Sequence, residues 1–161
     1  MTQTHTGLLS PAELFGMSGM EYFSGVIEGK YPAPPICDTV PMEFVEASPE
    51  RLILSSQATE QFLNPMGTVH AGFTATLLDT AAACIVHISL TAGEAYTTLE
   101  IKLTLHRAIT RETGELRVEG NMVNRGRRVA ASKSSVSDSR GRLLASATST
   151  CLIMPASEVR G

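Results

Sequence analysis

Residues 69–90 read VHAGFTATLLDTAAACIVHISL and form the most apolar stretch of the chain. His70, Asp79 and His87 interrupt this run, and Asp79 stands near its midpoint. A membrane-spanning helix rarely carries a carboxylate at that depth unless the group has a special role. We therefore expect residues 69–90 to form a buried helix in a soluble protein that has no membrane partner.

This helix has two unlike faces when successive residues are rotated by about 100° around its axis. The side that carries Asp79 has only small residues, whereas the opposite side is mostly bulky. The small set is Gly72, Ala75, Thr76, Ala82 and Ala83, and the opposite set is Phe73, Leu77, Ala81, Cys84 and Ile88. We expect the bulky face to press into a sheet. The small face leaves room for the close approach of a second helix or of a ligand.

The segments on both sides of the helix have the alternating pattern of strands. Before it, residues 40–47 and 51–58 predict two strands around the turn Ser48-Pro49-Glu50. After it, residues 98–106 alternate strictly. Their apolar face is Leu99, Ile101, Leu103 and Leu105. Three more strands are expected near residues 115–123, 128–137 and 142–153. The connecting turns contain Thr113-Gly114, Arg125-Gly126 and Arg140-Gly141, all suited to hairpins.

Two strands, one buried helix and a meander of four strands predict an α+β fold, in which a curved antiparallel sheet wraps round the helix. Ahead of it, Ser10, Pro11 and Glu13 predict the capped start of an N-terminal helix, which the prolines at 32–35 must end before Lys30. We divide the chain into a helical N-terminal appendage (1–36), a main domain (37–155) and a C-terminal tail (156–161).

Composition excludes several classes of function. The 161 residues are 43% hydrophobic and 18% charged, as in globular proteins. A net charge of −3 argues against a nucleic-acid partner, which requires a basic surface. Three scattered cysteines and the lack of an apolar leader indicate the cytoplasm. No cluster has the spacing of metal ligands, and His87 and His106 are isolated, so neither a metal nor another cofactor is expected.

Asp79 is the main candidate for chemistry. A buried carboxylate must be hydrogen-bonded, near water or protonated, and a pocket can tune its pKa toward general-base work. A purely structural aspartate fits the pattern equally well. The loop Asn64-Pro65-Met66-Gly67-Thr68 leads into the first helical turn, where free backbone N–H groups favour a developing negative charge. The sequence thus supplies a polarising group and, two turns later, a candidate base.

Three motifs in register resemble the phenylacetate-degradation (PaaI-like) family of hot-dog thioesterases. Asn64, His70-Ala71-Gly72 and Asp79 are similar to its N…HGG…D signature. The segment Tyr96–Leu103 resembles its first long strand after the helix, and Val123–Val129 resembles its hairpin near coenzyme A. The resemblance covers residues 40–154 and implies a hot-dog fold, acyl-coenzyme A hydrolysis, and a homodimer with its active sites at the interface. It also implies tetramers built from two such dimers.

The resemblance assigns roles to individual positions. Asp79 corresponds to the carboxylate that activates water or attacks the thioester, and the Ala71 N–H corresponds to the oxyanion donor. Asn64 corresponds to the side chain that holds the thioester region, Thr98 to the hydroxyl that orients water, and His70 to a residue that shapes the loop. The substrate-binding positions are Gly72 and the hairpin residues Arg125, Gly126, Arg127 and Arg128, of which at least one arginine would contact the phosphates. Ala71 departs from the usual glycine, which puts the substrate range in doubt.

Two other functions remain open at this stage. The first is an acyl-thioester hydratase or dehydratase of the same fold, in which His70 and Asp79 would move protons together, although ideal helical spacing puts them nearly opposite. The second is a module that binds acyl-coenzyme A without turnover. The sequence does not choose between aryl and short or medium acyl groups, nor between water activation and a covalent anhydride.

Overall fold

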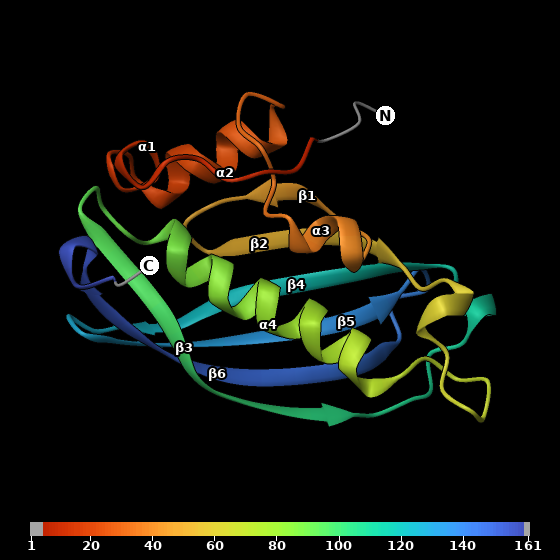
Figure 1. The fold of residues 1–161 in the computed structure, drawn as a ribbon. Helices are drawn as coiled ribbons and strands as arrows, with labels where there is room; N and C mark the ends of the chain where they lie inside the picture. Colours follow the sequence, from red (N-terminus) through yellow and green to blue (C-terminus); the bar gives the residue numbers. More distant parts are fainter. Residues whose placement is uncertain (1–4, 160–161) are drawn as a thin grey trace.

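One long helix lies against one curved sheet in the computed structural model, which describes residues 5–159 (Figure 1). The strands are β1 (Met42–Ala47), β2 (Arg51–Gln57), β3 (Glu94–Leu105), β4 (Glu115–Arg125), β5 (Val129–Asp138) and β6 (Leu143–Pro155). The helices are α1 (Pro11–Phe15), α2 (Gly19–Ile27), α3 (Ile36–Thr39) and α4 (Ala71–Ile88). The sheet is antiparallel in the order β1-β2-β4-β5-β6-β3, and α4 crosses its concave face. The predicted α+β arrangement is confirmed.

The apolar stretch forms α4, and most of this helix is buried. It is long and apolar enough to cross a membrane by composition, but the sheet covers it as the core helix of the fold. The bulky face lies against the sheet as predicted, with Phe73, Leu77 and Ile88 buried. The small face is divided. Gly72, Ala75, Thr76 and Asp79 remain at least partly exposed, whereas Ala82 and Ala83 are buried.

Small and hydroxyl-bearing strand residues let α4 approach the sheet closely. Ser134 Oγ donates a hydrogen bond to the carbonyl of Leu78 at 2.8 Å, and Ser132 Oγ donates to the carbonyl of Ala82 at 2.7 Å. A side chain at Gly120 would have its Cβ 2.2 Å from the Ala81 carbonyl oxygen. These contacts fix the height and rotation of α4 above the sheet, and therefore the position of every side chain on its other face.

The predicted four-strand meander is wrong at one point. Strands β4, β5 and β6 form a meander with hairpins at Arg125-Gly126 and Arg140-Gly141, as expected. Strand β3, however, pairs with β6 at the far edge of the sheet, so Thr113-Gly114 is not a hairpin. This turn instead carries the chain from one edge of the sheet toward the middle. Turn chemistry signals a reversal of the chain, but it does not specify which strands pair afterwards.

The strict alternation predicted for residues 98–106 is interrupted by a β-bulge. The register of β3 against β6 shifts between Thr98 and Glu100, which leaves Leu99 without a direct partner. Because of this extra residue, Thr98 and Ile101 both face α4, whereas simple alternation would place them on opposite faces. Leu99 is 59% exposed and does not join the predicted apolar face.

The N-terminal segment forms two helices where one was predicted. The capping box of Ser10 and Glu13 starts α1 as expected. This helix ends at Phe15, and Ser18 caps α2 through a hydrogen bond from the Glu21 N–H. Tyr22, Phe23 and Val26 of α2 belong to the main hydrophobic core. Residues 1–4 and 160–161 of the predicted terminal segments lie outside the described part of the chain.

Gly120 provides a direct test of the contact between helix and sheet. We expect Gly120→Ala to lower the free energy of unfolding by about 3 kcal/mol, because its methyl group meets the backbone of α4 and cannot rotate away. Urea denaturation followed by circular dichroism measures this change. Gly7→Ala is the matched control, since its Cβ would make only ordinary contact with Pro32 at 3.5 Å. Equal stability of the two variants would contradict the proposed contact.

Candidate active site

Asp79 and Thr98 form one half of the candidate site. Thr98 Oγ1 donates a long hydrogen bond of 3.4 Å to Asp79 Oδ1, and the bulge in β3 is what brings this hydroxyl to α4. Burial raises the pKa of Asp79, and the hydrogen bond from Thr98 lowers it in part. The carboxylate is half-buried on the small-residue face, so it combines increased basicity with access from outside the subunit.

Two cysteines lie near this pair and are poor nucleophiles. Cys151 is the direct cross-strand partner of Thr98, and both it and Cys84 are buried. Burial raises the pKa of both thiols, which keeps them protonated at neutral pH. Because the thiolate is the reactive form of cysteine, neither residue is a candidate nucleophile.

The loop before α4 forms the other half, and Asn64 holds this loop closed. Its Nδ2 donates to Thr68 Oγ1 at 2.8 Å, and its Oδ1 accepts from the backbone N–H groups of Met66 at 2.9 Å and Thr68 at 3.3 Å. Gly67 completes the turn at φ 78°, a conformation that suits glycine. The side chain of Asn64 is therefore committed mainly to the shape of the loop.

His70 is the N-cap of α4. Its Nδ1 accepts a hydrogen bond of 2.9 Å from the N–H of Gly72, so this nitrogen is unprotonated here. A Cβ at Gly72 would lie 3.0 Å from the same nitrogen, which explains the small residue. The Ala71 N–H has no acceptor among residues 5–159 and remains free at the positive end of the helix dipole. Asn64 and Ala71 both line a pocket of about 240 Å³.

The two halves of the site are far apart within one chain. Asp79 follows Ala71 by eight residues on a straight helix, which corresponds to about 12 Å along its axis. A single thioester carbonyl cannot contact both groups at that separation. The structure thus brings together Asp79 with Thr98, and Asn64 with Ala71, but it does not bring the two pairs together.

The arginines of the β4–β5 hairpin differ in their surroundings. Arg125 Nη2 bonds to both carboxylate oxygens of Glu94, at 3.0 and 3.1 Å, while its buried Nε has no partner within the described structure. Arg127 and Arg128 are exposed and form no ion pair with residues 5–159. Of the three arginines predicted to bind substrate, Arg127 and Arg128 therefore have no ion partner in the described part of the chain, and Arg125 has one.

The contacts of His87 and His106 indicate structural roles for these two histidines. The His87 ring packs on Tyr22, Phe23 and Tyr96 at centroid distances of 5.6, 5.3 and 5.2 Å, and burial lowers its pKa to about 4. His106 Nε2 is hydrogen-bonded to Ser146 Oγ at 2.8 Å. Residues 5–159 contain no group of three or more His, Cys, Asp or Glu side chains that could hold a metal ion.

Sequence reasoning missed three contributors to this geometry. Thr68 is a partner of Asn64, and the Asn-Pro-Met-Gly turn beside it was the signal that could have identified it. Glu94 holds Arg125, but it is distant in sequence and had no signal of its own. The bulge at Leu99 was equally hidden, because the residues around it alternate without interruption.

Known proteins share both the sequence pattern and the fold. A family model described as the thioesterase superfamily matches residues 66–145. A phenylacetic acid degradation-related protein from Ralstonia eutropha JMP134 is 32% identical, with a TM-score of 0.75, and the match covers 81% of this chain and 98% of that one. A comparison with curated proteins gives no match.

More distant solved structures share the fold. A thioesterase from Haemophilus influenzae is 12% identical, with a TM-score of 0.74 and coverage of 99% of this chain and 100% of that one. A hypothetical thioesterase protein from Streptococcus pneumoniae TIGR4, solved with coenzyme A, is 21% identical, with a TM-score of 0.64 and coverage of 71% and 86%. Since the 32% identical relative is matched over nearly its full length and the family model spans α4 and the strands β3, β4 and β5, the chain belongs to the thioesterase superfamily, has the hot-dog fold and is a thioester hydrolase.

Proposed function

We propose that this enzyme hydrolyses an acyl-coenzyme A thioester, with an aryl or a short- to medium-chain acyl group, using Asp79 as base or nucleophile. The observation that carries the proposal is the half-buried Asp79 carboxylate, whose pKa is raised by burial and which is held by Thr98. It faces outward from a stripe of small residues, where a substrate can reach it.

The proposed chemistry uses a carboxylate, a backbone amide and water. In one course, Asp79 accepts a proton from water as the water oxygen adds to the thioester carbonyl carbon. The Ala71 N–H donates to the resulting oxyanion, and collapse of the tetrahedral intermediate breaks the carbon–sulfur bond. The departing thiolate takes the proton, which gives free acid and coenzyme A. In the other course, Asp79 adds to the carbonyl carbon directly, and the carbon–sulfur bond breaks as the thiolate leaves. Water then hydrolyses the mixed anhydride, which restores the Asp79 carboxylate and provides the proton that the thiolate takes up.

We infer that the working unit is a homodimer, because the two halves of the site are too far apart in one chain. In a two-fold dimer the Ala71 amide of one subunit can meet the partner's Asp79. The surface beside Asp79 supports this arrangement. Strand β3 is at an edge of the sheet, and its Leu99 and Leu105 are 59% and 48% exposed. The family resemblance further suggests a tetramer made from two dimers.

Coenzyme A is the proposed thiol group of the substrate. The Streptococcus pneumoniae relative was solved with coenzyme A. In this chain, Arg127 and Arg128 are the exposed hairpin cations, and guanidinium groups suit bidentate contacts with phosphate. Arg125 is held by Glu94 and would support the hairpin rather than bind the ligand.

Asp79→Asn separates the catalytic role from the structural one. We expect thioester turnover to fall by about a hundredfold or more, because a general base or nucleophile is lost. Stability at neutral pH should rise, since the folded state no longer holds an ionised carboxylate whose pKa burial has raised. A thiol-release assay across acyl- and aryl-coenzyme A substrates measures the first effect, and urea denaturation measures the second.

The pH dependence of stability provides the control for this variant. A raised pKa in the folded state makes the wild-type protein lose stability as the pH rises through that pKa. The advantage of Asp79→Asn should therefore shrink as the pH falls toward 3.8, the ordinary value for aspartate. Turnover within a factor of about ten of wild type would rule out the assigned role.

Ala71→Pro removes the proposed oxyanion donor and keeps the helix. Proline is favoured at the first helical position, and His70 already has the extended conformation that a residue before proline requires, at φ −60° and ψ 137°. We expect kcat to fall by about 100- to 1,000-fold. Ala71→Ser is the matched control, because it changes the side chain and retains the N–H. A similar loss in both variants would point to the side chain instead of the amide.

Co-expression of Ala71→Pro and Asp79→Asn subunits tests whether the site is shared. A mixed dimer contains one site with an intact amide and an intact carboxylate. With random pairing, about half of the dimers are mixed, and one of the two sites in each mixed dimer is intact. The mixture should therefore have about a quarter of wild-type activity, whereas each variant alone is nearly inactive. The control pairs Asp79→Asn with Asp79→Ala, which cannot form an intact site. If the mixture stays as inactive as this control, both groups act within one subunit.

A further inference from the structure

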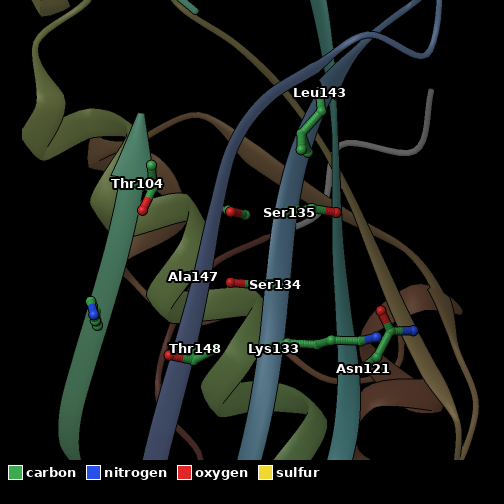
Figure 2. A pocket seen from close by; sticks show the side chains of 10 residues that line it. Thr104, Asn121, Lys133, Ser134, Ser135, Leu143, Ala147 and Thr148 are labelled. Carbon is green, nitrogen blue, oxygen red and sulfur yellow. The ribbon is translucent and has the colours of Figure 1, made fainter. Parts of the chain in front are cut away.

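The outer face of the sheet, which points away from α4, has a continuous polar row across four strands. Direct register partners connect Lys102 on β3 to Thr148 on β6, Thr148 to Lys133 on β5, and Lys133 to Asn121 on β4. Figure 2 shows Thr148, Lys133 and Asn121 side by side on neighbouring strands, with the Lys133 side chain extended toward Asn121. The lysines of the row therefore lie on the two sides of β6.

A second row of hydroxyl groups lies beside the first. Thr104 on β3 is opposite Ser146 on β6, which is opposite Ser135 on β5. These residues line a hollow together with Lys102, Lys133 and Leu143. Figure 2 shows the short Thr104 and Ser135 side chains there beside the longer Lys133 and Leu143 side chains. The resulting pocket has a volume of about 530 Å³.

The charged side chains that line this pocket are all positive. Its lining residues include two of the three lysines in the chain and no acidic residue. Neither lysine makes an ion pair with residues 5–159. The nearby Glu119 is occupied by Arg117 and Asn121, at 3.4 and 3.2 Å. In a chain with a net charge of −3, this patch is a local excess of positive charge.

We propose that this hollow, here called the outer-face pocket, binds a phosphorylated small molecule of about nucleotide size. Neighbouring strands are about 4.8 Å apart, so the backbones of β3 and β5 are about 10 Å apart. A diphosphate lying over β6 is within reach of Lys102 and, once its side chain turns away from Asn121, of Lys133. Thr148 and Ser146 on β6 provide hydroxyl groups between the strands that carry the two lysines. Charge-assisted hydrogen bonds of this kind are stronger than neutral ones.

A second copy of the chain is a less suitable occupant. A two-fold axis through this pocket would bring the unpaired lysines of two copies close together, where their charges repel. The pocket is also separate from the thioesterase site. Ser134 follows Lys133 in sequence and points to the other face of the sheet, where its Oγ donates a hydrogen bond of 2.8 Å to the Leu78 carbonyl of α4. The helix that carries Asp79 therefore lies on the face opposite to the pocket.

Inorganic pyrophosphate is the probe for this proposal. Isothermal titration calorimetry on the full chain should show saturable binding of pyrophosphate, and the double variant Lys102→Gln with Lys133→Gln should weaken it by at least about tenfold. Lys30→Gln is the matched control, because it removes the same charge at the remaining lysine, beside Tyr31. Its affinity for pyrophosphate should equal that of wild type.

Further readouts keep the proposal falsifiable. Thioester turnover by the double variant should match wild type, which shows that the fold and the Asp79 site are intact. No pyrophosphate binding to the wild-type protein at millimolar concentration, or equal binding by the double variant, would overturn the proposal. A change of oligomeric state in the double variant during sedimentation would overturn it as well, because the face would then be an interface between subunits.

Discussion

The burial of one long apolar helix against a single sheet is the constraint on which the rest of this structure depends. A helix that is apolar nearly all round must be covered on most sides, and one curved sheet does this only if its strands bend round the helix. Gly120, Ser132 and Ser134 make the contact close, two of them by bonding to carbonyl oxygens of α4. The same contacts set the rotation of α4, and with it the direction in which Asp79 points.

The rigidity of α4 also keeps the two halves of the candidate site apart. Ala71 has the free amide at the start of α4, and Asp79 is two turns further along the same helix. Neither group can move relative to the other without breaking the helix, and this separation is the reason for proposing that a second subunit completes the site. The half-buried carboxylate carries a cost in free energy as well, since burial opposes its ionised form. A strained or destabilised group is tolerated where function benefits from it.

The two faces of the sheet have separate chemistry because side chains alternate along each strand. Inward residues such as Ser134 hold α4, and their neighbours such as Lys133 point outward. Mutational effects on the two faces should therefore be largely independent. The relative from Ralstonia eutropha, with a TM-score of 0.75, shows that this architecture extends well beyond the matched residues 66–145.

The sequence alone determined the features that depend on neighbouring residues. The period of residues 69–90 predicts α4, the Ser10 capping box predicts the start of α1, and the glycine turns at 126 and 141 predict two hairpins. The isolation of Asp79 on a face of small residues also marked it as a candidate. Only the tertiary structure decided that β3 pairs with β6, that the bulge turns Thr98 toward Asp79, and that Glu94 holds Arg125. These features depend on which distant strands pair, and the local periods of helices and strands contain no information about that choice.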